Sequence, residues 1–442
     1  MLINSYWLSL RKNIIISFLL DIFVFFIFFI IFNIYALGYG TVSFNLLIQS
    51  YWLLISYIVG RYHQKNKDIL ENLKSISTSI LNIFIYFSFT YFLFYKFLDL
   101  KNNYIYGDNF IFFTRYILLS FISQYLLQIF LKSKAKSLPI WQFLGSEKSF
   151  SKLVNLTKSN FINIKFAMSI DEILIDNNKE KNIIIENFAD LSLPYQEKII
   201  NLYFQGENIF SIINWCEIVL QRFPSLFLSS DELLTLFANV RRGRSFQIRL
   251  KRISDIFLSL IILTLTLPLM IFFGLIIFLE DKGPILYFQN RVGKNGLKIR
   301  ICKLRTMRVN AEKSGIQWSK KDDDRITNIG KFLRASRIDE LPQLFSVLCG
   351  DMSLIGPRPE RPEIDSNLKE IIPFYDLRYL VKPGLSGWAQ VNYPYGSSIA
   401  DSEVKLTYDF FYIKNFSFWL DLLIFFRTIR LVTRREGSIP TR

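Results

Sequence analysis

The sequence predicts a multi-domain membrane protein. It should have four amino-terminal transmembrane helices, a small α/β domain, and a carboxyl-terminal α+β domain that begins with a bent membrane segment. Hydrophobic residues make up 51% of the 442 residues and 44 residues are phenylalanine, yet charged residues still reach 20%. Apolar stretches must therefore alternate with folded aqueous parts. The formal net charge of +16 suits anionic lipid head groups and phosphorylated ligands.

The composition also excludes several classes of function. A basic chain could bind nucleic acid, but the apolar stretches favour a membrane, so no nucleic-acid partner is expected. The three cysteines are far apart and lack C-x-x-C spacing, which predicts buried reduced thiols rather than disulfides or a zinc site. The single histidine, His63, lies in a polar loop between two apolar stretches. Histidine is therefore not expected as a nucleophile or general base in the soluble part.

Four apolar stretches of membrane-spanning length occur in residues 1–137. They are Asn13 to Phe32, Phe44 to Val59, Ser77 to Tyr95 and Phe110 to Leu131. Lysine and arginine precede the first stretch, lie between the second and third, and follow the fourth. The positive-inside rule then places both ends of this block in the cytoplasm.

Residues 138–240 have the pattern of a small α/β domain. Short β-like runs, such as Ile140 to Leu144 and Asn182 to Glu186, alternate with segments of helical periodicity such as Leu191 to Phe204. The first run is followed by Gly145-Ser146-Glu147-Lys148 instead of a G-x-G-x-x-G loop. A nucleotide site is therefore not expected in this domain.

The apolar stretch Ile253 to Leu279 opens the last predicted domain, residues 241–442. Basic clusters flank it on both sides, and Pro268 lies near its middle. These features predict a re-entrant helix-break-helix that enters one leaflet and returns, so that both ends stay in the cytoplasm. The alternative is a fifth ordinary span, which would place everything after Leu279 outside the cell.

The rest of this domain carries clusters of Arg, Lys, Gly and Pro suited to phosphate oxygens, although any single cluster could equally be a solvated surface. The segment around Asp339 and Glu340 is more informative. Pro342 is tolerated only in a first helical turn, so it predicts a helix that starts near Asp339. Both carboxylates would then lie at the positive helix end, with Arg334 and Arg337 offsetting their repulsion. Simple helix capping is the alternative role for the two acids.

Several motifs in chain order resemble the bacterial sugar transferase family. These are the polyprenol-phosphate hexose-1-phosphate transferases, also called monotopic-type phosphoglycosyl transferases. The resemblance runs from about Lys251 to Arg435. Its motifs are Lys251-Arg252, Gly283-Pro284, Lys303 to Met307, Asp339-Glu340, Gly356-Pro357-Arg358-Pro359 and Pro383 to Asn392. The amino-terminal spans and a degenerate Rossmann-like α/β domain look like the long exopolysaccharide-type members. One departure is Leu267-Pro268, where many members have Ser-Pro.

The resemblance implies roles for individual residues. Asp339 would be the nucleophile, and Glu340 its partner and a ligand of Mg²⁺, the implied cofactor. Asp409 would lie near the metal. The cations assigned to substrate phosphates, partly from the resemblance and partly from their place in the basic clusters, are Lys303, Arg305, Arg334, Arg337 and Arg358.

The function that follows is transfer of a hexose-1-phosphate from a UDP-sugar to polyprenol (undecaprenyl) phosphate, with release of UMP. It would be the first membrane step of exopolysaccharide, capsule or O-antigen synthesis. The expected location is the bacterial inner membrane, in contact with lipid, with the catalytic domain facing the cytoplasm. The hexose and a homodimer are left open. Two rival functions are a glycosyltransferase that moves only the sugar, with Asp339 as base, and a non-catalytic scaffold. A UDP product would support the first, and the intact acidic pair argues against the second.

The apolar stretch Phe416 to Val432 is interrupted by Asp421, Arg427 and Arg430. It predicts a helix either at the membrane surface or packed in the core.

Overall fold

The computed structural model describes residues 3–36, 49–50, 52–53, 55–57, 115–127, 129–130, 140–157, 162–175, 182–224, 227, 245–309, 311, 323–393, 396 and 398–433. The chain divides into two compact units, Met1–Ser137 and Leu138–Arg442. The predicted boundary near residue 240 lies outside the described residues, as does the third predicted membrane span.

The first unit contains the long helix α1 (Ile3–Ala36), which covers the first predicted span. Residues 115–127, within the fourth predicted span, are also helical and pack on it. Inside this contact the buried Asp21 carboxylate accepts hydrogen bonds from Ser120 Oγ at 2.7 Å and Gln124 Nε2 at 3.0 Å. Polar side chains commonly hydrogen-bond between membrane helices in this way. The four-span bundle itself stays a prediction.

The second unit begins with a four-stranded parallel sheet in the order β2-β1-β3-β4. Its strands are β1 (Ile140–Leu144), β2 (Asn163–Ala167), β3 (Asn182–Ile185) and β4 (Asn208–Ser211). Its helices are α5 (Glu147–Thr157), α6 (Ile170–Ile175), α7 (Leu193–Phe204), α8 (Ile212–Trp215) and a π-helix (Cys216–Leu220). The central strands β1 and β3 are almost entirely buried, which explains their continuous apolar sequences. The predicted strands and helix of this region are confirmed.

The carboxyl ends of β1 and β3 mark the point where the strand order reverses, where such folds usually bind ligands. Here the Glu186 carboxylate accepts hydrogen bonds from the Ser146 backbone N–H at 2.6 Å and from the Ser149 hydroxyl. A Cβ on Gly145 would lie 2.5 Å from the same carboxylate. The protein's own acid therefore occupies the amino-terminal end of α5.

The carboxyl-terminal domain mixes helices with two small sheets. Strands β5 (Leu286–Val292) and β6 (Lys298–Leu304) are antiparallel, and β7 (Ser353–Ile355) and β8 (Gly384–Ser386) are parallel. The helices are α10 (Ser245–Asp281), α11 (Asn328–Ser336), α12 (Gln343–Cys349), α13 (Pro362–Ile371), α14 (Trp388–Asn392), α15 (Ile399–Asn415) and α16 (Phe418–Thr433). Short 3₁₀ turns occupy Lys294–Gly296, Ile338–Glu340 and Tyr375–Leu380. Buried side chains of α12, β7, α13, α14, α15 and α16 form one core.

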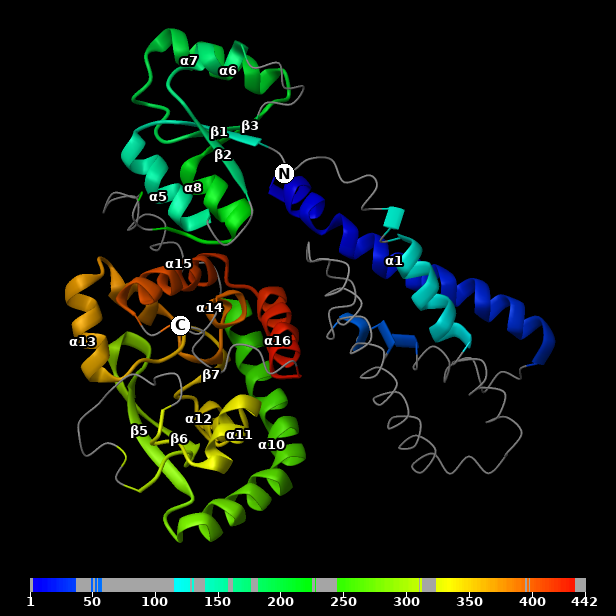
Figure 1. Cartoon of the computed structure of the whole chain (residues 1–442), viewed down its shortest axis with the longest axis vertical. Coiled ribbons are helices and arrows are strands. Elements are labelled where there is room, and N and C mark those ends of the chain that lie inside the picture. Colours follow the sequence, from blue (N-terminus) through cyan, green and yellow to red (C-terminus); the bar gives the residue numbers. More distant parts are fainter. Residues whose placement is uncertain are drawn as a thin grey trace. The chain divides into compact units, whose positions relative to one another are not determined.

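Helix α10 is continuous for 37 residues and passes through Pro268. Figure 1 shows it running down one side of the domain and curving beneath it. The predicted break is therefore wrong in detail, because the proline bends the helix without ending it. Thr264 and Thr266 hydroxyls bond back to carbonyls one turn earlier, at 2.8 Å each, which also favours bending.

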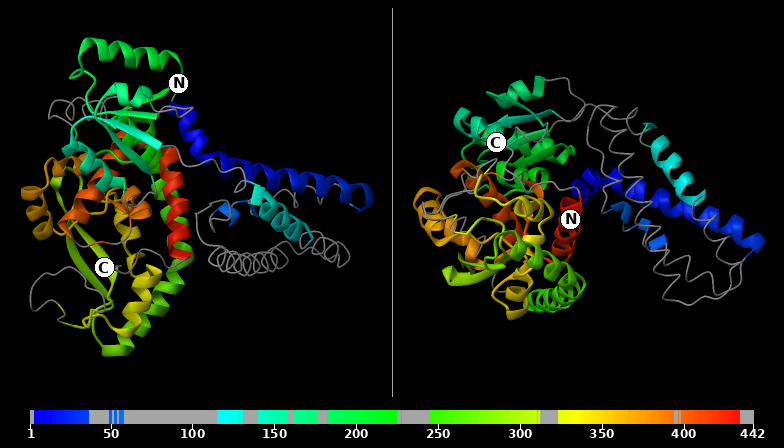
Figure 2. Two further views of the ribbon diagram at one scale, coloured as in Figure 1. Left: turned by 45° about the horizontal axis from the view of Figure 1, so that its top comes forward. Right: turned by 60° about the horizontal axis from the view of Figure 1, so that its bottom comes forward.

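The amino-terminal end of α10 is fixed to the domain by polar contacts. Arg252 donates to the Val347 and Leu348 carbonyls at 2.6 and 2.7 Å, at the carboxyl end of α12. Lys251 pairs with Asp421 of α16 at 2.7 Å, and Figure 2 shows α10 and α16 side by side. The Lys251-Arg252 motif thus attaches the apolar helix α10 to the folded domain.

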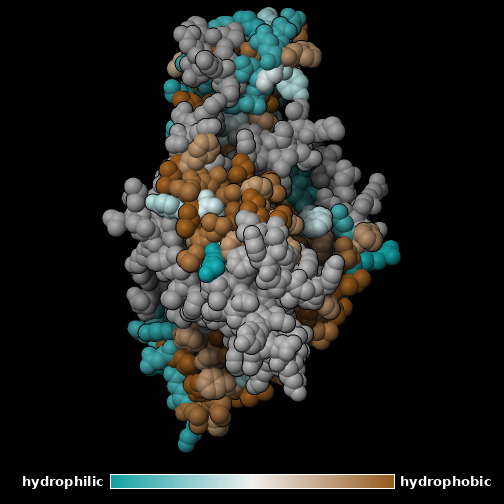
Figure 3. Space-filling model, turned by 90° about the vertical axis from the view of Figure 1, so that its right-hand side faces the viewer, coloured by the Kyte–Doolittle hydropathy of each residue, from teal (hydrophilic) through white to brown (hydrophobic). Residues whose placement is uncertain are grey.

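Beyond this anchor α10 is apolar, and many of its side chains are exposed. Leu265, Ile271 and Leu279 have exposed fractions of 74%, 66% and 68%. Hydrophobic residues also gather at the lower end of Figure 3, at the level of the bend of α10 in Figure 1. Within the described residues, α10 is the one helix long and apolar enough to cross a membrane. The surface is therefore suited to lipid contact.

Helix α16 packs in the core through Ile424 and Asp421, while Trp419 is exposed. The three cysteines are free, as expected, but only Cys216 is buried, and Cys349 is exposed at the end of α12. The prediction that all three thiols are buried is therefore wrong, because Cys349 lies in the last turn of a short helix at the surface and Cys302 is only half-buried in β6.

Candidate active site

The acidic pair lies in a tight turn between two helices. Asp339 and Glu340 belong to the 3₁₀ turn Ile338–Glu340, which follows Arg337 in the left-handed region (φ 57°). Helix α12 begins three residues after Glu340 and has no side-chain cap. The α-helix predicted to start near Asp339 thus begins a few residues later, after a 3₁₀ turn that contains both acids, and neither acid caps it. The left-handed turn is costly for arginine, and such strain gathers at functional sites.

Three cations surround the Glu340 carboxylate. Lys303 Nζ of β6 lies 3.1 Å from Oε1, Arg358 donates to both oxygens, and Arg337 Nη1 lies 3.8 Å from Oε2. Burial alone would raise the pKa of Glu340, but Arg358 and Lys303 outweigh it and hold this pKa well below its ordinary value. Glu340 therefore stays ionised, and it gathers positive charge around the turn.

Asp339 is buried beside this cluster but is held differently. In the part of the chain that the structure describes, nearby charged side chains shift its pKa without bonding to it, and its carboxylate receives no side-chain hydrogen bond. Burial, followed by the negative charge of Glu340, raises the pKa of Asp339 to about 6, while Lys303, Arg334 and Arg358 oppose the rise. A carboxylate with a raised pKa and free oxygens is more basic than usual and suited to nucleophilic attack.

The remaining predicted cations fall into two places. Arg334, in the last turn of α11, contributes charge near Asp339 and bonds Thr306 Oγ1 at 2.9 Å. Arg305 instead pairs with Asp281 and reaches the Ile277 carbonyl at the end of α10. A Cβ on Gly283 would lie 2.0 Å from its guanidinium, which explains glycine in the Gly283-Pro284 motif. Arg305 therefore binds the carboxyl-terminal end of α10 and does not take part in the contacts of Glu340.

Arg358 lies in the Gly356-Pro357-Arg358-Pro359 motif, whose backbone pairs with that of the distant Pro383 to Asn392 motif. The Gly356 N–H donates to the Ser386 carbonyl at 2.8 Å, and the Gly384 N–H donates to the Pro357 carbonyl at 2.9 Å. A Cβ on Gly356 or Gly384 would lie within 2.4 Å of facing backbone atoms. The glycines of both motifs are therefore required by close backbone packing.

Asp409, the expected metal neighbour, is paired with a cation. Its carboxylate lies 3.1 Å from Arg378 Nη2, and both side chains are buried. Arg378 also donates to the Arg358 carbonyl at 2.8 Å and to the Tyr375 hydroxyl. Sequence reasoning missed Arg378, although it lies shortly before the Pro383 to Asn392 motif. Arg291 was missed as a site residue as well, and it donates to the Pro359 carbonyl at 3.1 Å beside Arg358.

Comparison with known proteins identifies the carboxyl-terminal domain. The model of the bacterial sugar transferase family matches residues 246–435. A UDP-N-acetylgalactosamine-undecaprenyl-phosphate N-acetylgalactosaminephosphotransferase of Aeromonas hydrophila is 49% identical over 189 residues, which are 43% of this chain and 45% of that protein. The chain thus spans less than half the length of this curated relative.

Two shorter relatives are covered more completely. A putative undecaprenyl-phosphate N-acetylgalactosaminyl 1-phosphate transferase of Bacillus subtilis is 51% identical over 129 residues, which are 29% of this chain and 72% of that protein. A UDP-glucose:undecaprenyl-phosphate glucose-1-phosphate transferase of Caulobacter vibrioides is 39% identical over 202 residues, 45% of this chain and 76% of that protein. The resemblance predicted from the motifs is confirmed, and the chain belongs to the bacterial sugar transferase family.

Proposed function

We propose that the protein transfers a sugar-1-phosphate from a UDP-sugar to undecaprenyl phosphate and releases UMP. The observation that carries the proposal is the contrast within the acidic pair. Glu340 is ionised and surrounded by Lys303, Arg337 and Arg358, while Asp339 is buried with a pKa raised to about 6 and no side-chain hydrogen bond among the described residues. The names of the relatives support the same donor and acceptor classes.

The geometry suggests a covalent two-step reaction. The ionised Asp339 carboxylate attacks the sugar-bearing phosphorus, the bond to the UMP oxygen breaks, and UMP leaves with the electron pair. A phosphate oxygen of the polyprenol phosphate then attacks the acyl phosphate and releases the carboxylate. Lys303 and Arg358 offset negative charge in both steps. The reaction would begin a lipid-linked glycan.

The protein alone supplies only part of a Mg²⁺ site. The described residues contain no group of three or more acidic, histidine or cysteine side chains able to hold a metal. Mg²⁺ is commonly bound by one or two carboxylates together with substrate phosphates, and Asp339 and Glu340 can supply those carboxylates. When bound, the ion would offset charge on the diphosphate. Asp409 is engaged by Arg378, so we assign it no metal contact.

The reaction requires a water-soluble donor to meet a lipid acceptor at the cytoplasmic face of the inner membrane. Basic clusters flank α10, and its bend at Pro268 allows a re-entrant path. Single cysteines at Ser245 and Gly296, in a chain lacking the native three, test this path with an impermeant thiol reagent. Both positions should be labelled only after lysis. Labelling of position 296 alone in intact cells would indicate a fifth span and an external catalytic domain.

The activity is tested by incubating the purified full-length protein with undecaprenyl phosphate, Mg²⁺ and one of three donors. UDP-N-acetylgalactosamine, UDP-glucose and UDP-galactose cover the sugars named for the relatives. We expect UMP and a diphosphate-linked lipid from at least one donor. UDP as the nucleotide product would instead support a glycosyltransferase, and no product from any of the three would contradict the proposal for these sugars.

A further inference from the structure

The chain passes from the last helix of the α/β domain into the catalytic domain through a short segment. We define residues 217–223 as the clasp segment. The π-helix ends at Leu220, and the next residue, Gln221, adopts the left-handed conformation (φ 54°, ψ 42°) and turns the chain. Phe223 follows two residues later and is completely buried. A left-handed glutamine is uncommon, so this turn is held by its surroundings.

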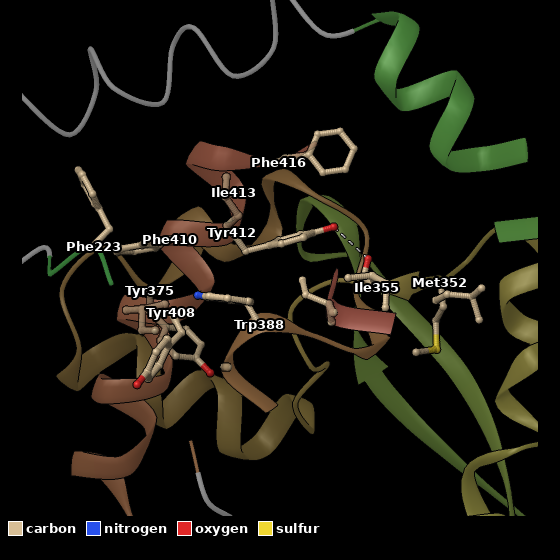
Figure 4. Close-up of a cluster of buried hydrophobic side chains, with 14 of the residues drawn as sticks. Phe223, Met352, Ile355, Tyr375, Trp388, Tyr408, Phe410, Tyr412, Ile413 and Phe416 are labelled. Atoms are coloured by element: carbon tan, nitrogen blue, oxygen red, sulfur yellow. Dashed lines mark hydrogen bonds between the residues drawn. The ribbon is translucent and has the colours of Figure 1, made fainter. Parts of the chain in front are cut away.

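Phe223 belongs to the catalytic core, although it reaches that core from the α/β domain. Its backbone N–H donates to the Thr407 carbonyl of α15 at 2.8 Å, and Lys414 Nζ lies 4.5 Å from its ring centroid. Figure 4 shows Phe223 beside Phe410 among side chains of the catalytic domain. Because protein interiors are closely packed, removing this ring would let α15 shift.

Polar contacts fix the same segment on both sides. Glu217 pairs with Lys414 at 2.6 Å and accepts from Asn415 at 2.8 Å. The Gln221 carbonyl accepts from Trp388 Nε1 at 3.0 Å.

Arg222 joins the two domains directly. It is 3% exposed and donates to the Leu156 carbonyl of α5 at 2.8 Å. Its guanidinium also lies 4.5 Å from the ring centroid of Tyr408 on α15.

Three successive contacts connect α15, the helix held by the clasp segment, to Glu340 of the acidic pair. Asp409, adjacent to Tyr408 on α15, pairs with Arg378, and Arg378 donates to the Arg358 carbonyl. The Arg358 guanidinium in turn bonds Glu340. A buried ion pair is stable only with good geometry. A shift of α15 would therefore displace Arg378 and, through it, Arg358.

We propose that the clasp segment is a positioning element for the active site: it seats α15 so that the Asp409–Arg378 pair holds Arg358 against Glu340. The α/β domain, in which the Glu186 carboxylate occupies the amino-terminal end of α5, would thus serve the reaction by completing the catalytic core. This inference rests on the proposed function, because Arg358 is taken to act on the substrate phosphates.

The test is a double-mutant cycle on the full-length protein, with UMP release per folded molecule as the readout. Phe223→Leu keeps an apolar side chain but shortens it, and Phe204→Leu is the matched control because Phe204 is 79% exposed in the same domain. We expect Phe223→Leu to lower kcat by about five- to tenfold, with no change for Phe204→Leu. In an Arg358→Lys background, Phe223→Leu should cost less than about twofold, since its effect passes through Arg358.

An equal loss in both backgrounds would mean that Phe223 only supports folding and would overturn the proposal, as would no loss beyond the Phe204→Leu control. If Phe223→Leu does not fold, Arg222→Lys enters the same cycle with the same two criteria. Absence of UMP from the wild-type protein would instead contradict the proposed function.

Discussion

The two domains of the second unit each contain an acid with a shifted pKa, the half-buried Glu186 and the buried Asp339, and the two carboxylates are held in opposite ways. Glu186 is satisfied by the Ser146 backbone and the Ser149 hydroxyl, and these bonds outweigh its burial and lower its pKa. Asp339 has no side-chain hydrogen bond among the described residues, and burial raises its pKa to about 6. A satisfied carboxylate stabilises a fold, whereas an unsatisfied one is available for chemistry.

The largest expected effect separates these two roles at Asp339. Asp339→Asn keeps the shape of the side chain but removes the nucleophile, so UMP release should fall by about a thousandfold or more. The melting temperature should not decrease, because burial of the ionised Asp339 carboxylate does not stabilise the wild-type fold. Retention of more than a small fraction of activity in the folded variant would show that Asp339 is not the nucleophile.

The pH dependence should follow from the same raised pKa. The carboxylate of Asp339 attacks only when ionised, so kcat/KM should fall by about tenfold per pH unit as the pH drops below about 6. Recovery of full activity on return to neutral pH would control for unfolding. A constant kcat/KM between pH 5 and 7 would contradict the assignment of this pKa to the attacking carboxylate.

Removal of a cation next to the pair should have an intermediate effect. Lys303→Gln abolishes the 3.1 Å contact with Glu340, and we expect kcat/KM to decrease about 10- to 100-fold. Lys298→Gln makes the same charge change at an exposed position on the same strand, β6, and should have little effect. Equal losses in both variants would indicate that only the net charge of the domain matters.

The smallest expected effect concerns Glu186. Because its folded pKa is lowered, the ionised form contributes stability above its ordinary pKa, and this contribution is lost as the pH falls through the folded pKa. Glu186→Gln should therefore lower the stability of the α/β domain by about 1 kcal/mol at pH 7, with less effect in acid. Glu197→Gln, at an exposed position on α7, is the control. Equal melting curves for the two variants would show that Glu186 is not satisfied as described.

Local patterns in the sequence predicted a large part of the fold. The strands β1 and β3 are short apolar runs, and α10 is a long one, so the length of each run indicates its structure. The bend at Pro268 was predicted as a break, because a proline signals a missing N–H but does not reveal how neighbouring turns adjust.

The site was predicted through its motifs but not through its long-range contacts. Lys303, Arg337 and Arg358 meet at Glu340, and their contact with substrate phosphates stays a prediction. Arg305 belongs to the same motif as Lys303 yet holds Asp281, because β6 ends at Leu304 and Arg305 lies beyond the strand. Phe223 contacts Thr407 and Arg378 contacts Asp409, and no local pattern marks pairs so far apart in the sequence.

The central claim is tested most directly by trapping the covalent intermediate. Wild-type protein is mixed with a donor that supports turnover, without polyprenol phosphate, quenched rapidly in acid, digested and analysed by mass spectrometry. We predict UMP release together with a sugar-phosphate mass on the peptide that contains Asp339, located on that residue and absent from Asp339→Asn. Donor turnover that begins only when the lipid acceptor is added, with no adduct at any quench time, would contradict the covalent account and favour direct transfer.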